Sequence, residues 1–177
     1  MSSTAGSAGR RPSSARLAVV PSSTGAARPA TADPHIVHRS RDLLERAEVL
    51  FDQAASVDDD GAERFRLFYL TAIRAAGAIL EIYEPTGKVR RRRGATDAWS
   101  RIKARAPECA ELADYFGGLS TMRSQVEAGL VKAVDPTFCA RVERRAVEFL
   151  DVADATLLAY EQGKLAPKRG VSRSTVA

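Results

Sequence analysis

The chain has 177 residues, enough for one domain with a buried core, and it carries 27 basic and 22 acidic residues. Its formal charge of +5 is uneven: residues 1–38 carry a net +3, residues 163–177 a net +4, and residues 39–162 a net −2. A broad basic face on the central part is therefore excluded. Cys109 and Cys139 lie too far apart for a CxxC redox motif or a zinc ribbon.

The apolar runs are only a few residues long, far short of a membrane span, so no membrane contact is expected. LAVV at 17–20 is also too short for the apolar region of a secretory signal. Two isolated cysteines in an alanine-rich chain are typical of buried small residues in a reducing compartment. We therefore expect a cytoplasmic protein.

Residues 1–38 are mostly Ser, Ala, Gly, Pro, Thr and Arg, which predicts a disordered basic N-terminal arm. His35 and His38 lie at its edge, so we predict no metal site there. The first helix is expected from Ser40, as N-cap, to about Ser56. The acidic run Asp58–Asp60 then favours the N-terminal end of the next helix through the helix dipole.

The strongest helix signal is Glu63–Glu84, where apolar residues recur at spacings of three and four over more than one face. We expect neighbouring helices to cover it on several sides. Arg74 lies in the middle of this run. It is expected to lie on a polar strip or to form an ion pair with the first helix, the candidate carboxylates being Glu45, Glu48 and Asp52.

Pro85 and Gly87 end the central helix, and Thr96 or Asp97 can cap a short helix that buries Trp99 and Ile102. A long helix from Pro107 to about residue 130 follows, with a bend at the pair Gly117 and Gly118.

Asp135 and Pro136 start a last helix, which ends near Gln162 and includes Val147 and Leu158 on its apolar face. The composition of residues 163–177, with four basic residues and no acidic residue, predicts a disordered basic tail. Residues 39–162 therefore predict an all-α antiparallel four- to five-helix bundle, with four long helices and one short one.

Positive charge in the central part is concentrated between two of these helices, at Lys88, Arg90, Arg91, Arg92 and Arg93. Without these five residues, segment 39–162 would carry −7. Guanidinium groups match phosphate oxygens, so this loop is a candidate site for RNA, DNA or a nucleotide. The alternative is a solvated loop in an arginine-rich protein.

The ordered region lacks the sequence motifs of common catalytic and nucleotide sites, and no histidine follows residue 38. No pair of carboxylates stands out for acid–base chemistry either. We therefore predict no catalytic residues and no cofactor.

The order of elements resembles the HEPN (higher eukaryote and prokaryote nucleotide-binding) superfamily, and most closely a small actinobacterial HEPN-like branch. The resemblance covers about residues 39–162 and rests on the stretches RFRLFYLTAIRAAGAILE and DAWSRIKARAPECAELADYF, with Trp99 and Ala106-Pro107-Glu108. It implies a bundle of four to five helices, frequent homodimerisation, and roles in RNA cleavage, nucleotide binding or defence.

HEPN nucleases carry an arginine and a histidine with four to six residues between them. Arg123 stands where that arginine would be, but residues 128–130 are Ala, Gly and Leu. The resemblance therefore implies a non-nuclease member. Arg123 is a candidate phosphate contact, and the alternative is an exposed arginine on a helix. The alternatives are a protein–protein interaction adaptor that does not bind nucleic acid and a divergent endoribonuclease.

Overall fold

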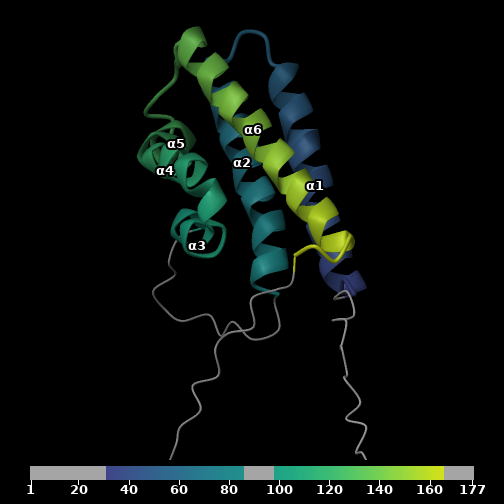
Figure 1. Cartoon of the computed structure of the whole chain (residues 1–177). Helices are drawn as coiled ribbons and strands as arrows, with labels where there is room; N and C mark the ends of the chain where they lie inside the picture. The colour runs from purple at the N-terminus through teal and green to yellow at the C-terminus, as the bar shows by residue number, and fades with distance from the viewer. Residues whose placement is uncertain (1–30, 86–97, 166–177) are drawn as a thin grey trace, which may run out of the picture.

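The computed structural model describes residues 31–85 and 98–165, and every regular element within them is helical. Three long helices lie side by side (Figure 1): α1 (Pro34–Ala55), α2 (Gly61–Tyr83) and α6 (Pro136–Glu161). Three shorter ones stack beside α2: α3 (Ala98–Arg105), α4 (Ala110–Gly118) and α5 (Ser120–Glu127). The predicted all-α bundle is confirmed. The arm before residue 31, the basic loop and the tail after residue 165 lie outside the described residues.

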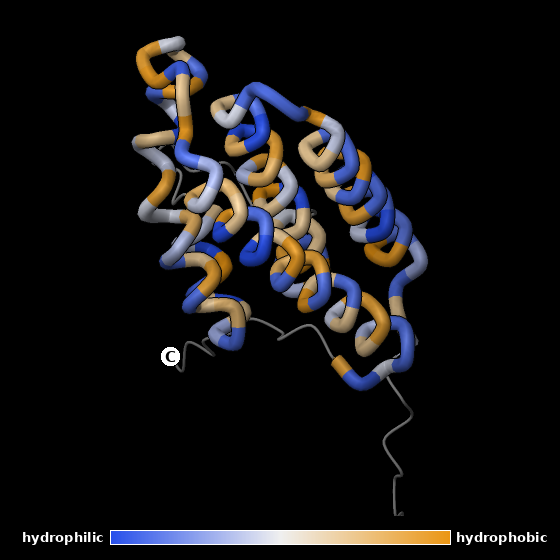
Figure 2. Tube along the Cα trace, turned by 90° about the horizontal axis from the view of Figure 1, so that it is seen from above, coloured by the Kyte–Doolittle hydropathy of each residue, from blue (hydrophilic) through white to orange (hydrophobic). Residues whose placement is uncertain are grey.

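Helix α2 is the centre of the core, as its sequence predicted. Thirteen of its residues are buried, including Phe65, Phe68 and Tyr69, and four of its alanines are fully inaccessible to solvent. Asp60 caps it by accepting a hydrogen bond from the backbone N–H of Glu63 at 2.9 Å. Hydrophobic and hydrophilic residues alternate along the helices of the bundle (Figure 2). Because buried residues lie on several sides of α2, the hydrophobic core of the bundle is built around this helix.

Helix α1 begins at Pro34, not near Ser40. Asp33 is the N-cap and accepts from the N–H of His35 at 2.8 Å, while Pro34 occupies the first turn. Ser40 is buried within the helix and donates its hydroxyl proton to the carbonyl of Ala78 on α2 at 3.0 Å. A serine hydroxyl can cap a helix or form a hydrogen bond to a neighbouring helix, and the hydroxyl of Ser40 bonds to the neighbouring helix α2.

The expected long helix 107–130 is divided, which corrects the count of four long helices. A 3-10 turn, Pro107–Cys109, leads into α4, which ends at Gly118, and α5 starts at Ser120. The glycine pair therefore marks a break between two helices. Helix α5 contributes no fully buried residue, so it lies on the surface of the bundle.

Helix α1 runs antiparallel to α2 and α6, whereas α2 and α6 run parallel. At their starts, the thiol of Cys139 donates to the carbonyl of Gly61 at 3.2 Å. The parallel arrangement arises because α3, α4 and α5 carry the chain back along α2 before α6 begins.

Two side chains depart from the sequence expectations, and Arg74 takes one of the two positions expected for it. Val147 and Leu158 of α6 are exposed, at 38% and 50% of their surface, although their spacing had placed them on the apolar face. Arg74 is exposed and forms no ion pair with a carboxylate among the described residues, so it lies on the polar strip of α2. Helical spacing identifies the apolar face of a helix, but it does not show which residues of that face another helix will bury.

We predict that Gly61→Ala destabilises the bundle by about 1–3 kcal/mol, the usual cost of overpacking. A Cβ at Gly61 would lie 2.6 Å from the carbonyl oxygen of Val134, a backbone atom that cannot rotate away. Gly118→Ala is the matched control, since nothing lies within 4 Å of its Cβ position. Urea unfolding of both variants measures the difference, and equal stabilities would contradict the packing described for Gly61.

Candidate nucleic-acid interface

The start of α1 and the ends of α2 and α6 meet at one end of the bundle (Figure 1). The N–H of Asp33 donates to the hydroxyl of Tyr160 near the end of α6 at 3.1 Å. Arg39 in the first turns of α1 donates to Glu81 in the last turn of α2 at 2.9 Å. These contacts hold the start of α1 against the ends of α2 and α6.

Glu84 attaches α3 to the same end. Its carboxylate accepts hydrogen bonds from Arg101 at 2.8 and 3.0 Å and from Arg105 at 2.7 Å, and its side chain is only 11% exposed. Burial alone would raise the pKa of Glu84, but the hydrogen bonds from the two arginines outweigh it and lower the pKa. Glu84 is therefore an ionised clamp between α2 and α3.

The predicted site residues Lys88, Arg90, Arg91, Arg92 and Arg93 lie in segment 86–97, outside the described residues. The structure does show where that segment is attached. It leaves α2 just after Pro85 and returns at Ala98, the first residue of α3. The Glu84 clamp holds these two attachment points at the same end of the bundle.

The segments on either side of the described residues join the bundle at this end too, because α1 begins and α6 ends there. Together, residues 1–30, 86–97 and 166–177 carry 12 of the chain's 27 basic residues and one acidic residue. The described residues carry 15 basic and 21 acidic side chains, a net −6.

Four described arginines at this end are paired with three carboxylates. Arg101 and Arg105 share Glu84, Arg39 pairs with Glu81, and Arg41 pairs with Glu161. They hold the helix ends in place and leave little unbalanced positive charge. The excess positive charge of the chain therefore resides in the attached segments.

Arg123 lies elsewhere. It is on α5, donates to Glu127 at 2.8 Å, and its guanidinium carbon lies 5.5 Å from the centre of the Tyr69 ring. Tyr69 precedes Tyr83 by 14 residues on α2, which is about 21 Å along the helix axis. Within one chain, the structure does not bring Arg123 to the attachment points of the basic loop.

Beneath α5 lies a polar contact that sequence reasoning missed. The indole N–H of Trp99 donates to the hydroxyl of Tyr69 at 2.9 Å, and that hydroxyl pairs with Ser120 at 3.0 Å. Trp99 also stacks on Phe116 with ring centres 5.6 Å apart. A buried Trp or Tyr usually finds such a partner. Only the fold brings these three helices to one point, so no local signal could have shown it.

The neighbourhood of Arg123 does not form the arginine–histidine pair of HEPN nucleases. Helix α5 ends at Glu127, and Gly129 adopts a left-handed backbone with φ of 70°. Residues 128–130 therefore form a turn, and no imidazole stands there to accept the proton of a ribose hydroxyl.

Within the described ranges, no group of three or more His, Cys, Asp or Glu residues is arranged to hold a metal ion. His35 and His38 are exposed on α1, and His38 lies 3.6 Å from Asp42. The same residues contain no helix that is both long and apolar enough to span a membrane.

These features define an all-α bundle with segments of high positive charge attached at one end. A family model described as SAV_6107-like HEPN matches residues 54–154, more than half of the chain. The chain therefore belongs to the SAV_6107-like HEPN family, and the HEPN resemblance predicted from its sequence is confirmed. No curated protein and no solved structure matches the chain.

We predict that Glu84→Gln destabilises the fold at pH 7 by about 1–3 kcal/mol, because two arginines lose their ionised partner. The lowered pKa of Glu84 sets the pH dependence. Its contribution is fully present above its ordinary pKa of 4.5 and is lost as the pH falls through the lower folded-state pKa.

Urea unfolding at pH 7 and pH 3 measures this effect. The difference in the free energy of unfolding between wild type and Glu84→Gln should be smaller at pH 3 than at pH 7. Asp59→Asn is the control, since Asp59 is exposed in the turn between α1 and α2. A gap that stays constant between the two pH values would show that Glu84 does not act as an ionised clamp.

We also predict that both thiols of the folded protein resist alkylation at pH 8. Burial raises the pKa of Cys109 to about 11 and also raises the pKa of Cys139, so little reactive thiolate is present. Iodoacetamide followed by mass spectrometry should show modification only after unfolding in urea. Rapid modification of the folded chain would mean that one thiol is accessible and ionised.

Proposed function

We propose that this HEPN-like bundle binds nucleic acid or a nucleotide without cleaving it, and that Lys88 and Arg90–Arg93 supply the main contacts. The observation that carries the proposal is the common end of the bundle at which this segment, residues 1–30 and residues 166–177 are all attached. Arginine forks bind phosphate oxygens in two-pronged hydrogen bonds. A polyanion at this end would meet all three segments.

The charge distribution supports the proposal. Because the described residues carry a net −6, a phosphate backbone should be repelled from most of the bundle and attracted to the basic end. Arg123 is a second contact in this proposal, on the α5 side of the bundle, and the pairing of two chains would provide a way to bring it near another chain's basic loop. Homodimerisation is therefore part of the proposal.

The absence of cleavage is proposed from the surroundings of Arg123. Its guanidinium is engaged by Glu127 and Tyr69, and no histidine follows residue 38 anywhere in the chain. A phosphate contact needs only positive charge, whereas ribose cleavage needs a group that moves a proton.

An adaptor role is a second candidate, favoured by apolar side chains exposed on α1 and α6. It predicts a complex with another protein that persists after nuclease treatment. Nucleic-acid binding predicts instead a complex that nuclease removes. A tagged pull-down from cells with and without nuclease distinguishes the two roles.

We predict that changing Arg90–Arg93 to glutamine weakens binding of labelled RNA and DNA and makes it less dependent on salt. Four lost phosphate contacts should reduce the slope of log affinity against log salt by about 3. Fluorescence anisotropy titrations at several salt concentrations measure both quantities. The labelled RNA should remain full-length throughout.

The matched control changes four exposed cations elsewhere to glutamine: Arg46, Arg74, Lys132 and Arg144. Both variants lose four positive charges, so an effect of net charge alone would appear equally in each. Equal losses, or no loss in the Arg90–Arg93 variant, would refute the assignment of the loop. Shortening of the RNA that stops when Arg123 is changed to glutamine would favour a divergent nuclease instead.

A further inference from the structure

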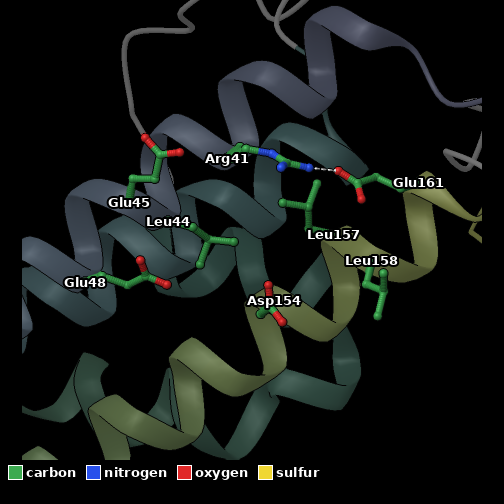
Figure 3. Close-up of a pocket in the computed structure, with 8 residues that line it drawn as sticks. All are labelled: Arg41, Leu44, Glu45, Glu48, Asp154, Leu157, Leu158 and Glu161. Carbon is green, nitrogen blue, oxygen red and sulfur yellow. Dashed lines mark hydrogen bonds and ion pairs between the residues drawn. The ribbon is translucent and has the colours of Figure 1, made fainter.

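A groove of about 270 Å³ lies between α1 and α6 (Figure 3). Leu44 of α1 and Leu157 of α6 are about 5% and 4% exposed and form its floor, and Leu158 lies at its edge. The remaining lining residues are charged: Arg41, Glu45, Glu48, Asp154 and Glu161. The groove is thus an apolar floor between acidic walls.

The acidic walls are not neutralised. Arg41 is the one cation among the lining residues, and it pairs with Glu161 at the end of α6. Glu45, Glu48 and Asp154 form no ion pair with a cation among the described residues, so the lining carries a net −3. These three carboxylates are free to bind cations of another segment.

Exposed apolar residues extend the groove. The described residues contain four exposed large hydrophobic side chains, and Val49, Val147 and Leu158 belong to α1 and α6. Val49 lies four residues from Glu45, while Val147 and Leu158 lie seven and four residues from Asp154. Helical spacing therefore places each of them on the same face as a groove carboxylate. An occupant of this surface should combine apolar and basic side chains.

A second copy of the bundle placed face to face does not meet this requirement. In a two-fold contact the same surface meets itself, so Glu45, Glu48 and Asp154 would approach their own equivalents. Like charges brought together in this way disfavour association. The occupant must carry opposite charge.

We propose that residues 10–20 of the chain's own N-terminal arm dock in the α1/α6 groove. Arg10, Arg11 and Arg16 offer three cations for the three free carboxylates. Leu17–Val20, LAVV, offers apolar side chains for the leucines of the floor. Residues 166–177 also carry three cations, but they contain no comparable apolar run. The N-terminal arm matches the groove in both charge and apolar side chains, so it is favoured over residues 166–177 as the occupant.

The point at which the arm is attached permits this docking. Asp33 is held at Tyr160, and the Arg41–Glu161 pair at the near end of the groove is only about two helical turns along α1. From residue 20 to residue 33 the chain can span up to about 43 Å, whereas the groove from Arg41 to Glu48 is about 10 Å long. Such a short tether gives the arm a high effective concentration at the groove.

The test uses the full chain with a nitroxide label at Ser14→Cys, and paramagnetic broadening of backbone amide signals on α1 and α6 as the readout. The buried native thiols should not take the label. We expect broadening at Glu48 and Asp154. Broadening should be lost in Glu45→Gln/Asp154→Asn and kept in Asp58→Asn/Asp59→Asn, which changes the net charge equally in the exposed turn between α1 and α2.

A second matched pair tests the occupant. Changing Arg10, Arg11 and Arg16 to serine should abolish the broadening, whereas changing Lys168, Arg169 and Arg173 to serine should leave it intact. The proposal is overturned if no amide on α1 or α6 is broadened, or if the groove variant has no effect. It is also overturned if broadening appears only between labelled and unlabelled chains, since a second copy would then supply the arm.

Discussion

The burial of α2 is the constraint on which the rest of the structure depends. Its aromatic residues fill the core, while Ala72, Ala75, Ala76 and Ala78 are fully inaccessible and let neighbouring helices approach closely. Helix α1 covers one side, α6 another, and the shorter helices a third. Because α2 is covered on so many sides, it fixes the direction of each neighbouring helix. The positions of the ends of α1 and α6 relative to the end of α2 are therefore set by this packing.

This constraint also brings together the polar side chains at one end of the bundle. Once α1 and α6 are packed on α2, Arg39 reaches Glu81 and Asp33 reaches Tyr160. Glu84 then adds α3 to the same end through Arg101 and Arg105. Such part-buried pairs contribute modestly to stability. Their larger effect is positional, because they determine where the basic segments meet the bundle.

The separation of charge is the other organising feature. The described residues form an acidic body, and the chain's excess positive charge lies in three segments attached at one end of it. An acidic body repels phosphate and can attract the chain's own arginines. The proposed binding of nucleic acid and the proposed docking of the arm therefore draw on the same electrostatic contrast, and the arm's arginines would serve one or the other at a given moment.

The sequence by itself determined the all-α class, the central helix and the start of α6 at Asp135 and Pro136, and it marked Gly117 and Gly118 as an irregular point, although it predicted a bend there and not a division into two helices. These follow from short-range rules, namely helical periodicity, capping and the weakness of glycine in helices. It also predicted the HEPN resemblance and the concentration of charge at Lys88 and Arg90–Arg93.

Only the tertiary structure decided what depends on distant residues. It placed Ser40 inside α1, where its hydroxyl donates to the carbonyl of Ala78 on α2, whereas the start of α1 follows from the local cap formed by Asp33 and Pro34. It left Val147 and Leu158 exposed, because no helix of the described residues covers that side of α6. It separated Arg123 from the attachment points of the basic loop and brought Tyr69, Trp99 and Ser120 together. Each of these depends on which helices become neighbours, and a helical pattern in the sequence does not specify that.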